Sequence, residues 1–251
     1  MGMLLRSSAR RTVVAQTSGD RSPRLAPDGS EWLYPGMAEP SVHEARVAAA
    51  AALRRLSHAM VSRDLDADML DRLRDEADAL AAAIEPAPRR DRQAMLTEHV
   101  ERMFGMVESE GDLETGHEAF DVMADRAIGG PANPMGVQVD VEFLDDEVVG
   151  VVTLLPAYEG GPGRAHGGMV AAIFDDITGY VLRIAQTAAF TGTLTVRYHK
   201  PTPMERPLTF RARLVGREDR RLYITADCHD GDTLVSSCEA TYITIDPTVF
   251  A

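Results

Sequence analysis

The sequence predicts an α+β domain, an antiparallel sheet wrapped around one long helix, preceded by an α-helical N-terminal segment. Three observations lead to this expectation. From about residue 135, short runs rich in β-branched residues alternate with turn residues. One apolar stretch with helical periodicity interrupts these runs, and long Ala- and Leu-rich stretches precede them. The order β-β-α-β-β-β-β, with connections of the antiparallel type, favours packing the sheet on its single helix.

The N-terminal 40 residues are rich in Pro, Gly, Ser and Arg and lack periodicity, so we expect residues 1–40 to form a flexible tail. Its start, MGMLLRSSARRTVVAQTSG, contains no acid, and this composition fits either a transit peptide or a disordered tail. We expect the helical segment to cover residues 41–125 and the α+β domain to cover residues 126–251.

The helical segment combines Ala, Leu and Met with intervening charges. Ser41 followed by Glu44 is typical of a capping box, which predicts a helix start. Pro86 and Pro88 end this helical stretch. A second stretch, RQAMLTEHVERMFGMVES, covers residues 92–109. We expect these helices to serve packing or oligomerisation, and a regulatory lid is the alternative.

Six strands are expected in the C-terminal part. The first alternates, with Val137, Val139, Val141 and Phe143 on one face, and the second is more fully apolar. Turns are marked by KPTPMERP, REDR and HDGD. The expected strands lie within residues 136–146, 147–158, 190–200, 207–217, 221–231 and 233–246.

The helix expected from Gly168 to Gln186 carries two adjacent acids. Asp175 lies nearly opposite the apolar stripe, beside small residues, and Asp176 lies on a flank. A solvated helix face accounts for both aspartates, and an acid partly covered by a ligand or a second chain is the alternative. The stripe that should lie on the sheet consists of Val170, Phe174, Ile177, Val181 and Ile184, with Ile173 at its edge.

The residues at the start of this helix suggest a binding function. Gly167 and Gly168 leave backbone N–H groups accessible where the helix dipole favours negative charge, so they can bind a phosphate or stabilise an oxyanion. A tight strand-to-helix turn is the alternative. His166 alone is typical of a loop histidine. No second ligand stands at a useful spacing from it, so we expect no metal site.

Three motifs together resemble those of the PaaI-type hotdog-fold acyl-CoA thioesterases, over roughly residues 128–246. NPMGV, residues 133–137, is similar to the family's Asn-Pro-x-Gly-Leu entry into the first strand. HGGMVAAIFDD, residues 166–176, is similar to its His-Gly-Gly helix start, with Asp175 nine positions after His166. TLTVRYHKPTP, residues 193–203, is similar to its strand ending in Tyr-x-(Lys/Arg)-Pro.

This resemblance implies a hotdog fold, in which a six-stranded antiparallel sheet curls around the central helix. It implies hydrolysis of an acyl-CoA thioester to a free acid and coenzyme A, without a cofactor, in fatty acid metabolism. It also implies homodimers joined edge to edge, often paired into homotetramers, with active sites at the subunit interface. The helical N-terminal segment lies outside the resemblance.

The resemblance also implies roles for particular residues. Asp175 is the expected catalytic carboxylate, as general base or as nucleophile, and the Gly168 N–H is expected to polarise the thioester carbonyl. His166 is expected to shape the loop and to contact the thioester oxygen. The other residues expected in this pocket are Thr191 or Thr193, which would position the water or Asp175, and Asn133 and Gly167.

Coenzyme A also requires cationic groups for its phosphates. Arg197, His199 and Lys200 lie near the end of a strand, and Arg164 lies in the loop before the helix. Ordinary solvated surface cations are the alternative. The only lysine of the chain falls in the Tyr-x-Lys-Pro position, which favours a phosphate contact.

Composition limits the other function classes. A net charge of −13 argues against nucleic acid as a partner, because the chain has no excess of cations to displace counterions. No apolar run approaches a bilayer span, so we expect no membrane insertion. Two cysteines are too few for a disulfide framework, which fits a cytoplasmic location. The competing functions are a non-catalytic acyl-CoA-binding or regulatory module and a hydratase or dehydratase on the same fold. A scaffold function of the N-terminal helices is a further alternative.

Overall fold

The computed structural model describes residues 41–91, 94 and 124–245, which belong to one compact unit, Pro40–Ala251. Helix α1 (Val42–Ser62) begins with the predicted capping box. The Ser41 hydroxyl accepts the Glu44 N–H at 3.2 Å, and the Glu44 carboxylate accepts the Ser41 N–H at 2.7 Å. No helix among the described residues is long and apolar enough to cross a membrane.

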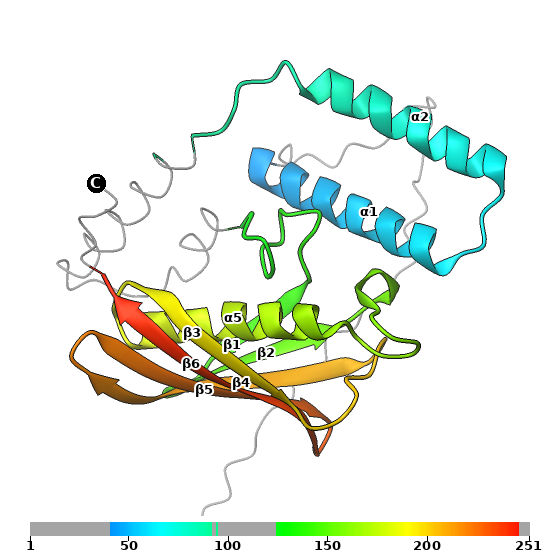
Figure 1. Cartoon of the computed structure of the whole chain (residues 1–251). Helices are drawn as coiled ribbons and strands as arrows, with labels where there is room; N and C mark the ends of the chain where they lie inside the picture. The colour runs from blue at the N-terminus through cyan, green and yellow to red at the C-terminus, as the bar shows by residue number, and fades with distance from the viewer. Residues whose placement is uncertain (1–40, 92–93, 95–123, 246–251) are drawn as a thin grey trace, which may run out of the picture. The chain divides into compact units, whose positions relative to one another are not determined.

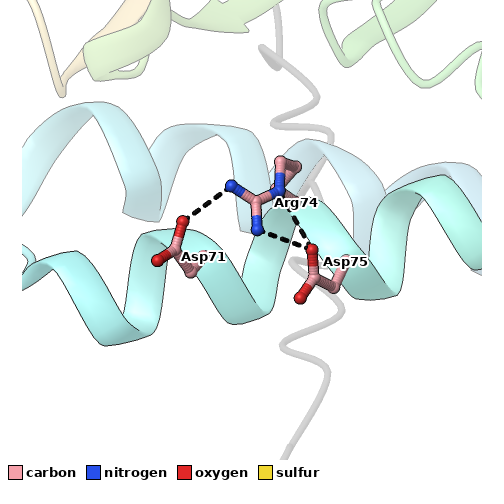
Figure 2. A network of polar contacts seen from close by, with 3 residues as sticks. All are labelled: Asp71, Arg74 and Asp75. Atoms are coloured by element: carbon pink, nitrogen blue, oxygen red, sulfur yellow. Dashed lines mark hydrogen bonds and ion pairs between the residues drawn. The ribbon is translucent and has the colours of Figure 1, made fainter.

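The helical stretch expected over residues 41–85 is divided. Helix α2 (Ala67–Ile84) starts anew at Asp66, whose carboxylate accepts the Met69 N–H at 2.8 Å. No residue of α2 is buried by the described chain, and its surface carries local ion pairs. Figure 2 shows Arg74 between Asp71 and Asp75, at 2.7 and 2.8 Å. Such exposed pairs add little stability. The helix expected over residues 92–109 lies outside the described residues, apart from residue 94.

Six antiparallel strands of the described residues form one sheet in the order β1-β2-β4-β5-β6-β3, and helix α5 (Gly167–Ile184) lies along one face of it (Figure 1). This arrangement confirms the predicted α+β fold, a sheet around one helix after an α-helical segment. A 3-10 turn, η1 (Pro156–Tyr158), and a glycine-rich loop lead from β2 to α5. The strands are β1 (Val139–Phe143), β2 (Glu147–Thr153), β3 (Ala189–Tyr198), β4 (Pro207–Glu218), β5 (Arg221–Asp230) and β6 (Thr233–Thr244).

The predicted apolar stripe of α5 forms the centre of the core. Val170, Phe174, Ile177 and Val181 are fully buried, and Phe174 meets Phe210 of β4 edge-on at 5.1 Å between ring centroids. The helix approaches β2 closely at Gly150, where an added Cβ would lie 2.3 Å from the Ile177 Cδ1. Glycine at 150 therefore lets α5 settle on the sheet.

Strand β3 is an edge of the sheet, paired only with β6 among the described strands. Most of its residues are exposed, including Phe190 and Tyr198. Its register shifts between Thr191 and Thr193, a bulge centred on Gly192. One side of β3 thus leaves backbone groups without a strand partner in the described chain. The site described next lies along this edge.

Candidate active site

Helix α5 begins with a histidine cap, one residue earlier than the sequence predicted. The His166 backbone is extended, with φ −65° and ψ 128°, and its Nδ1 accepts the Gly168 N–H at 3.0 Å. Because Nδ1 accepts, the neutral ring carries its proton on Nε2. The Gly168 N–H, the predicted carbonyl donor, therefore already has a partner inside the chain.

Gly167 supplies the unoccupied donor at the helix start. Within residues 41–91 and 124–245, no hydrogen bond engages the Gly167 N–H. The Gly167 carbonyl accepts the Tyr198 hydroxyl of β3 at 2.6 Å, and an added Cβ at 167 would lie 3.3 Å from that oxygen. Tyr198 thus fixes the first turn of α5 against the edge strand. The assignment of the carbonyl donor to Gly168 remains a prediction, and the geometry favours Gly167.

The second part of the site is an acid paired with a threonine. Asp175 is exposed on the solvent side of α5, as its helical position predicted, and its Oδ1 accepts the Thr191 hydroxyl at 2.9 Å. Thr193 lies beyond the bulge, opposite Thr241 of β6, and in the described part of the chain no bond joins it to Asp175. Of the two threonines considered, the structure brings Thr191 to the acid.

Two buried hydroxyl groups hold the backbone of this acid in place. Tyr242 of β6 donates to the Asp175 carbonyl oxygen at 3.1 Å, and its oxygen lies 2.9 Å from the Thr178 Oγ1. Burial raises the pKa of the Tyr242 phenol, so the phenol remains protonated. Tyr242 was not predicted as a site residue, and Tyr198 entered only as the tyrosine of the Tyr-x-Lys-Pro motif. Both follow a strand pattern in which a tyrosine is ordinary, so only the fold shows what their hydroxyls reach.

Asp176 is not on a solvated flank. Its side chain is only 11% exposed, and its Oδ1 lies 3.5 Å from the Arg126 Nε. Arg126 also stacks on the Tyr180 ring and bonds its hydroxyl. Burial raises the pKa of Asp176 more than Arg126 lowers it. The solvated interpretation is therefore wrong for Asp176, which joins the loop before β1 to the side of α5.

A backbone contact places the segments that carry Arg164 and Lys200 side by side near the helix start. Arg197 directly precedes Tyr198 in β3, so its side chain lies on the opposite face of the sheet. The Ala165 N–H donates to the Thr202 carbonyl at 3.0 Å, so the segment after Lys200 runs beside the glycine-rich loop that carries Arg164. Arg164, Arg197 and Lys200 are exposed, and the His199 Nε2 lies 2.8 Å from the Ser237 Oγ. Their phosphate-binding role remains a prediction.

The Asn133 side chain hydrogen-bonds to backbone groups of its own loop. Its Nδ2 donates to the Asp125 carbonyl at 3.2 Å, and its Oδ1 accepts the Met135 N–H at 2.9 Å. Both side-chain atoms thus hold the loop before β1, and a substrate contact of Asn133 remains a prediction.

Other nucleophiles and ligands give no competing site in the described chain. Burial raises the pKa of both Cys228 and Cys238 to about 12, so neither thiol ionises near neutral pH. Among the residues at 41–91 and 124–245, no three His, Cys, Asp or Glu side chains are arranged to hold a metal ion.

The fold and the site define a class: a hotdog domain whose helix begins with an available amide and carries an exposed acid at the sheet edge. Residues 162–237 match the family model of the Thioesterase superfamily. This match lies within the sheet-and-helix part of the chain and agrees with the resemblance to the hotdog-fold thioesterases.

Individual proteins agree with this assignment. The chain is 34% identical to acyl-coenzyme A thioesterase THEM4 of Mus musculus over 91 residues, 36% of this chain and 39% of that protein. It is 32% identical to acyl-coenzyme A thioesterase THEM5 of Homo sapiens over 74 residues, 30% of each chain. The matches thus span less than half the length of these curated relatives.

A solved structure described as a thioesterase superfamily protein is similar to a larger part of the chain. It has 28% sequence identity and a TM-score of 0.61, and the match covers 79% of this chain and 94% of the other. This coverage exceeds the C-terminal domain, so the likeness extends into the N-terminal segment.

Proposed function

We propose that this protein is an acyl-CoA thioesterase that hydrolyses a thioester to a free acid and coenzyme A. The Asp175–Thr191 pair at the β3 edge carries the proposal, because it presents an exposed carboxylate in a thioesterase-superfamily domain. The activity of the relatives named above supports the reaction class.

Two chemical routes use these residues. As a general base, Asp175 takes a proton from water while the water oxygen bonds to the carbonyl carbon, and the carbon–sulfur bond then breaks to release the thiolate. As a nucleophile, an Asp175 carboxylate oxygen bonds to the carbonyl carbon, and the carbon–sulfur bond breaks to release the coenzyme A thiolate. Water then opens the mixed anhydride to the free acid and the Asp175 carboxylate. In both routes negative charge builds on the carbonyl oxygen, which a fixed N–H at the start of α5 stabilises. Removing one such donor costs about 2.7–4 kcal/mol in other enzymes.

One chain is not sufficient for this chemistry. Asp175 follows Gly167 by eight residues in one helix, so the two lie about 12 Å apart along its axis at 1.5 Å per residue. A single carbonyl cannot contact both. We therefore propose a homodimer paired through β3, in which Asp175 of one protomer faces the helix start of its partner. Pairing of such dimers into a tetramer is compatible with this site.

The coenzyme A moiety would lie over the exposed cations at the end of β3. Arg197 and Lys200, together with Arg164 of the glycine-rich loop, supply positive charge against a net charge of −13. His199 is held by Ser237 beside them. Phosphate groups bind such a cluster by charge-assisted hydrogen bonds.

The first experiment measures free-thiol release from a panel of short, long and aryl acyl-CoAs. Asp175→Asn should lower turnover at least about 10²-fold, the contribution of a general base or nucleophile. Asp176→Asn is the matched control. Asp176 pairs with Arg126 and is not part of the proposed chemistry, so this variant should leave turnover unchanged. Equal effects of both variants would contradict the assignment. Tight acyl-CoA binding without turnover in the wild type would favour a non-catalytic binding module.

The second experiment tests whether two protomers share each site. Gly167→Pro removes the N–H at the first helical position, where proline is well tolerated, and the extended His166 suits a following proline. Gly167→Ala is the control, since it adds a side chain but keeps the N–H. Both Asp175→Asn and Gly167→Pro should be inactive alone.

A mixed dimer of these two inactive variants contains one intact site. Random exchange of subunits between equal amounts of the two variants should therefore restore about a quarter of wild-type turnover. Half of the dimers are then mixed, and one of the two sites in each mixed dimer is intact. No recovery, with mixed dimers present by native mass spectrometry, would refute the shared site.

A further inference from the structure

Helix α1 contacts the C-terminal domain through a buried histidine. His58 is 9% exposed, and its Nδ1 accepts the Ala157 N–H of η1 at 3.1 Å. Its ring meets the Tyr158 ring edge-on, with 4.9 Å between centroids. The acceptor at Nδ1 requires the neutral ring, with its proton on Nε2.

Arg54, one helical turn earlier, anchors a second segment. It donates to the carbonyl oxygens of Pro131 and Asn133 at 3.0 and 2.6 Å, in the loop before β1. The Tyr158 hydroxyl donates to the Gly136 carbonyl at 2.7 Å and so ties η1 to that loop. Helix α1 thus holds two segments that are also bonded to each other.

The segment held by His58 leads directly to the candidate active site. The Tyr158 carbonyl accepts the His166 N–H at 2.8 Å, and Glu159 pairs with Ala165 in an antiparallel bridge. The loop is tight at Gly160, where an added Cβ would lie 2.8 Å from the His166 Cα. The position of η1 therefore sets the position of His166, whose side chain caps the helix through the Gly168 N–H.

We propose that α1 is part of the active-site framework and that His58 is a positioning residue, which places the start of α5 through Ala157 and Tyr158. This inference rests on the proposed thioesterase function for its effect on turnover. Its structural content is independent of that function, because the contacts from His58 to His166 exist whatever the substrate.

The inference predicts a pH response. The groups that face His58 are Arg54 on its own helix and Tyr158 on η1. Burial, and secondly Arg54, lower the pKa of His58, so its neutral form persists below the ordinary histidine range. Once protonated, Nδ1 becomes a donor and can no longer accept the Ala157 N–H.

The test compares His58→Leu, which has no acceptor, with His58→Asn, whose side-chain oxygen can replace Nδ1. Turnover of an acyl-CoA that the wild type hydrolyses should fall by about 10- to 100-fold in His58→Leu, the effect of a small misplacement of reacting groups. The KM should change little, because in the described part of the chain His58 contacts η1 and none of the cations proposed to bind coenzyme A. His58→Asn should recover most of the turnover. In the wild type, turnover should fall at acidic pH as the neutral His58 ring becomes protonated, and His58→Asn should not show this fall.

Hydrogen exchange supplies a readout that needs no activity. Ala157 and His166 amides should exchange faster in His58→Leu than in the wild type, with protection restored in His58→Asn. If His58→Leu does not fold, the comparison of wild type with His58→Asn at pH 5 and pH 7.5 replaces it. Unchanged protection and turnover in every variant would overturn the inference. A wild-type protein without hydrolase activity would refute the proposed function. Amide hydrogen exchange would still decide whether His58 positions η1 and His166.

Discussion

The Arg126–Asp176 pair yields a quantitative prediction, because its two halves should respond unequally to substitution. The side chains are 19% and 11% exposed, and the single contact between Nε and Oδ1 measures 3.5 Å. At that distance the attraction is about 5 kcal/mol for an effective dielectric constant near 20. Arg126→Met removes this attraction and leaves a buried carboxylate, so it should lower the free energy of unfolding by about 3–5 kcal/mol at pH 8.

Asp176→Asn should behave differently. The raised pKa of Asp176 means that burial disfavours its carboxylate more than Arg126 stabilises it. The native state therefore holds the Asp176 proton more tightly than the unfolded state does, and its contribution to stability falls as pH rises above the ordinary aspartate value of about 3.9. A neutral amide avoids that penalty, so Asp176→Asn should cost little at pH 8.

Urea denaturation at pH 5 and pH 8 of both single variants and the double variant checks this reasoning. The double variant should regain most of the stability that Arg126→Met loses, apart from the lost stacking on Tyr180, about 0.5–1 kcal/mol. The deficit of Arg126→Met should shrink at pH 5, where the stranded carboxyl binds a proton. A large loss in Asp176→Asn with none in Arg126→Met would show that groups other than Arg126 stabilise the carboxylate and would refute the argument.

Two further variants test the packing and the support of the acid. Gly150→Ala should lower the free energy of unfolding by about 1–3 kcal/mol, because the new methyl overlaps the Ile177 Cδ1; adding Ile177→Val, which deletes that atom, should restore stability in thermal denaturation. Tyr242→Phe should lower the free energy of unfolding by about 1 kcal/mol through the lost hydrogen bonds and should also slow thiol release. A loss of stability with full turnover would show that the hydroxyl does not position Asp175.

Much of the fold follows from periodicity. The apolar stripe of α5 was predicted residue by residue, because a helix buried on one side repeats its apolar positions every three to four residues. The alternation in β1 likewise predicted which side chains pack on the core. The break between α1 and α2 was not predicted, since Leu65 continues the apolar composition and only the Asp66 cap marks the new start.

The site was predictable where residues are close in sequence and not where they meet through the fold. The exposed position of Asp175 followed from its helical position opposite the stripe, whereas its expected catalytic role came from the family resemblance and stays a prediction. Its expected partner was limited to two threonines, because the bulge at Gly192 decides which one reaches the acid. A glycine within a strand pattern is compatible with a bulge but does not fix its position or type. His58 and Ala157 are 99 residues apart, and the contact between them depends on the docking of α1.

The bulge at Gly192 also affects what can add to the sheet. An edge strand of regular, flat geometry accepts almost any extended polypeptide, which makes it a starting point for aggregation. In β3 the irregularity interrupts even spacing of backbone donors and acceptors, so a foreign strand meets a mismatch partway along. Deletion of Gly192 would make the pairs Thr191–Tyr242 and Thr193–Thr241 consecutive in one regular register and would leave the flanking side chains on their present faces. The straightened edge should then be more prone to self-association.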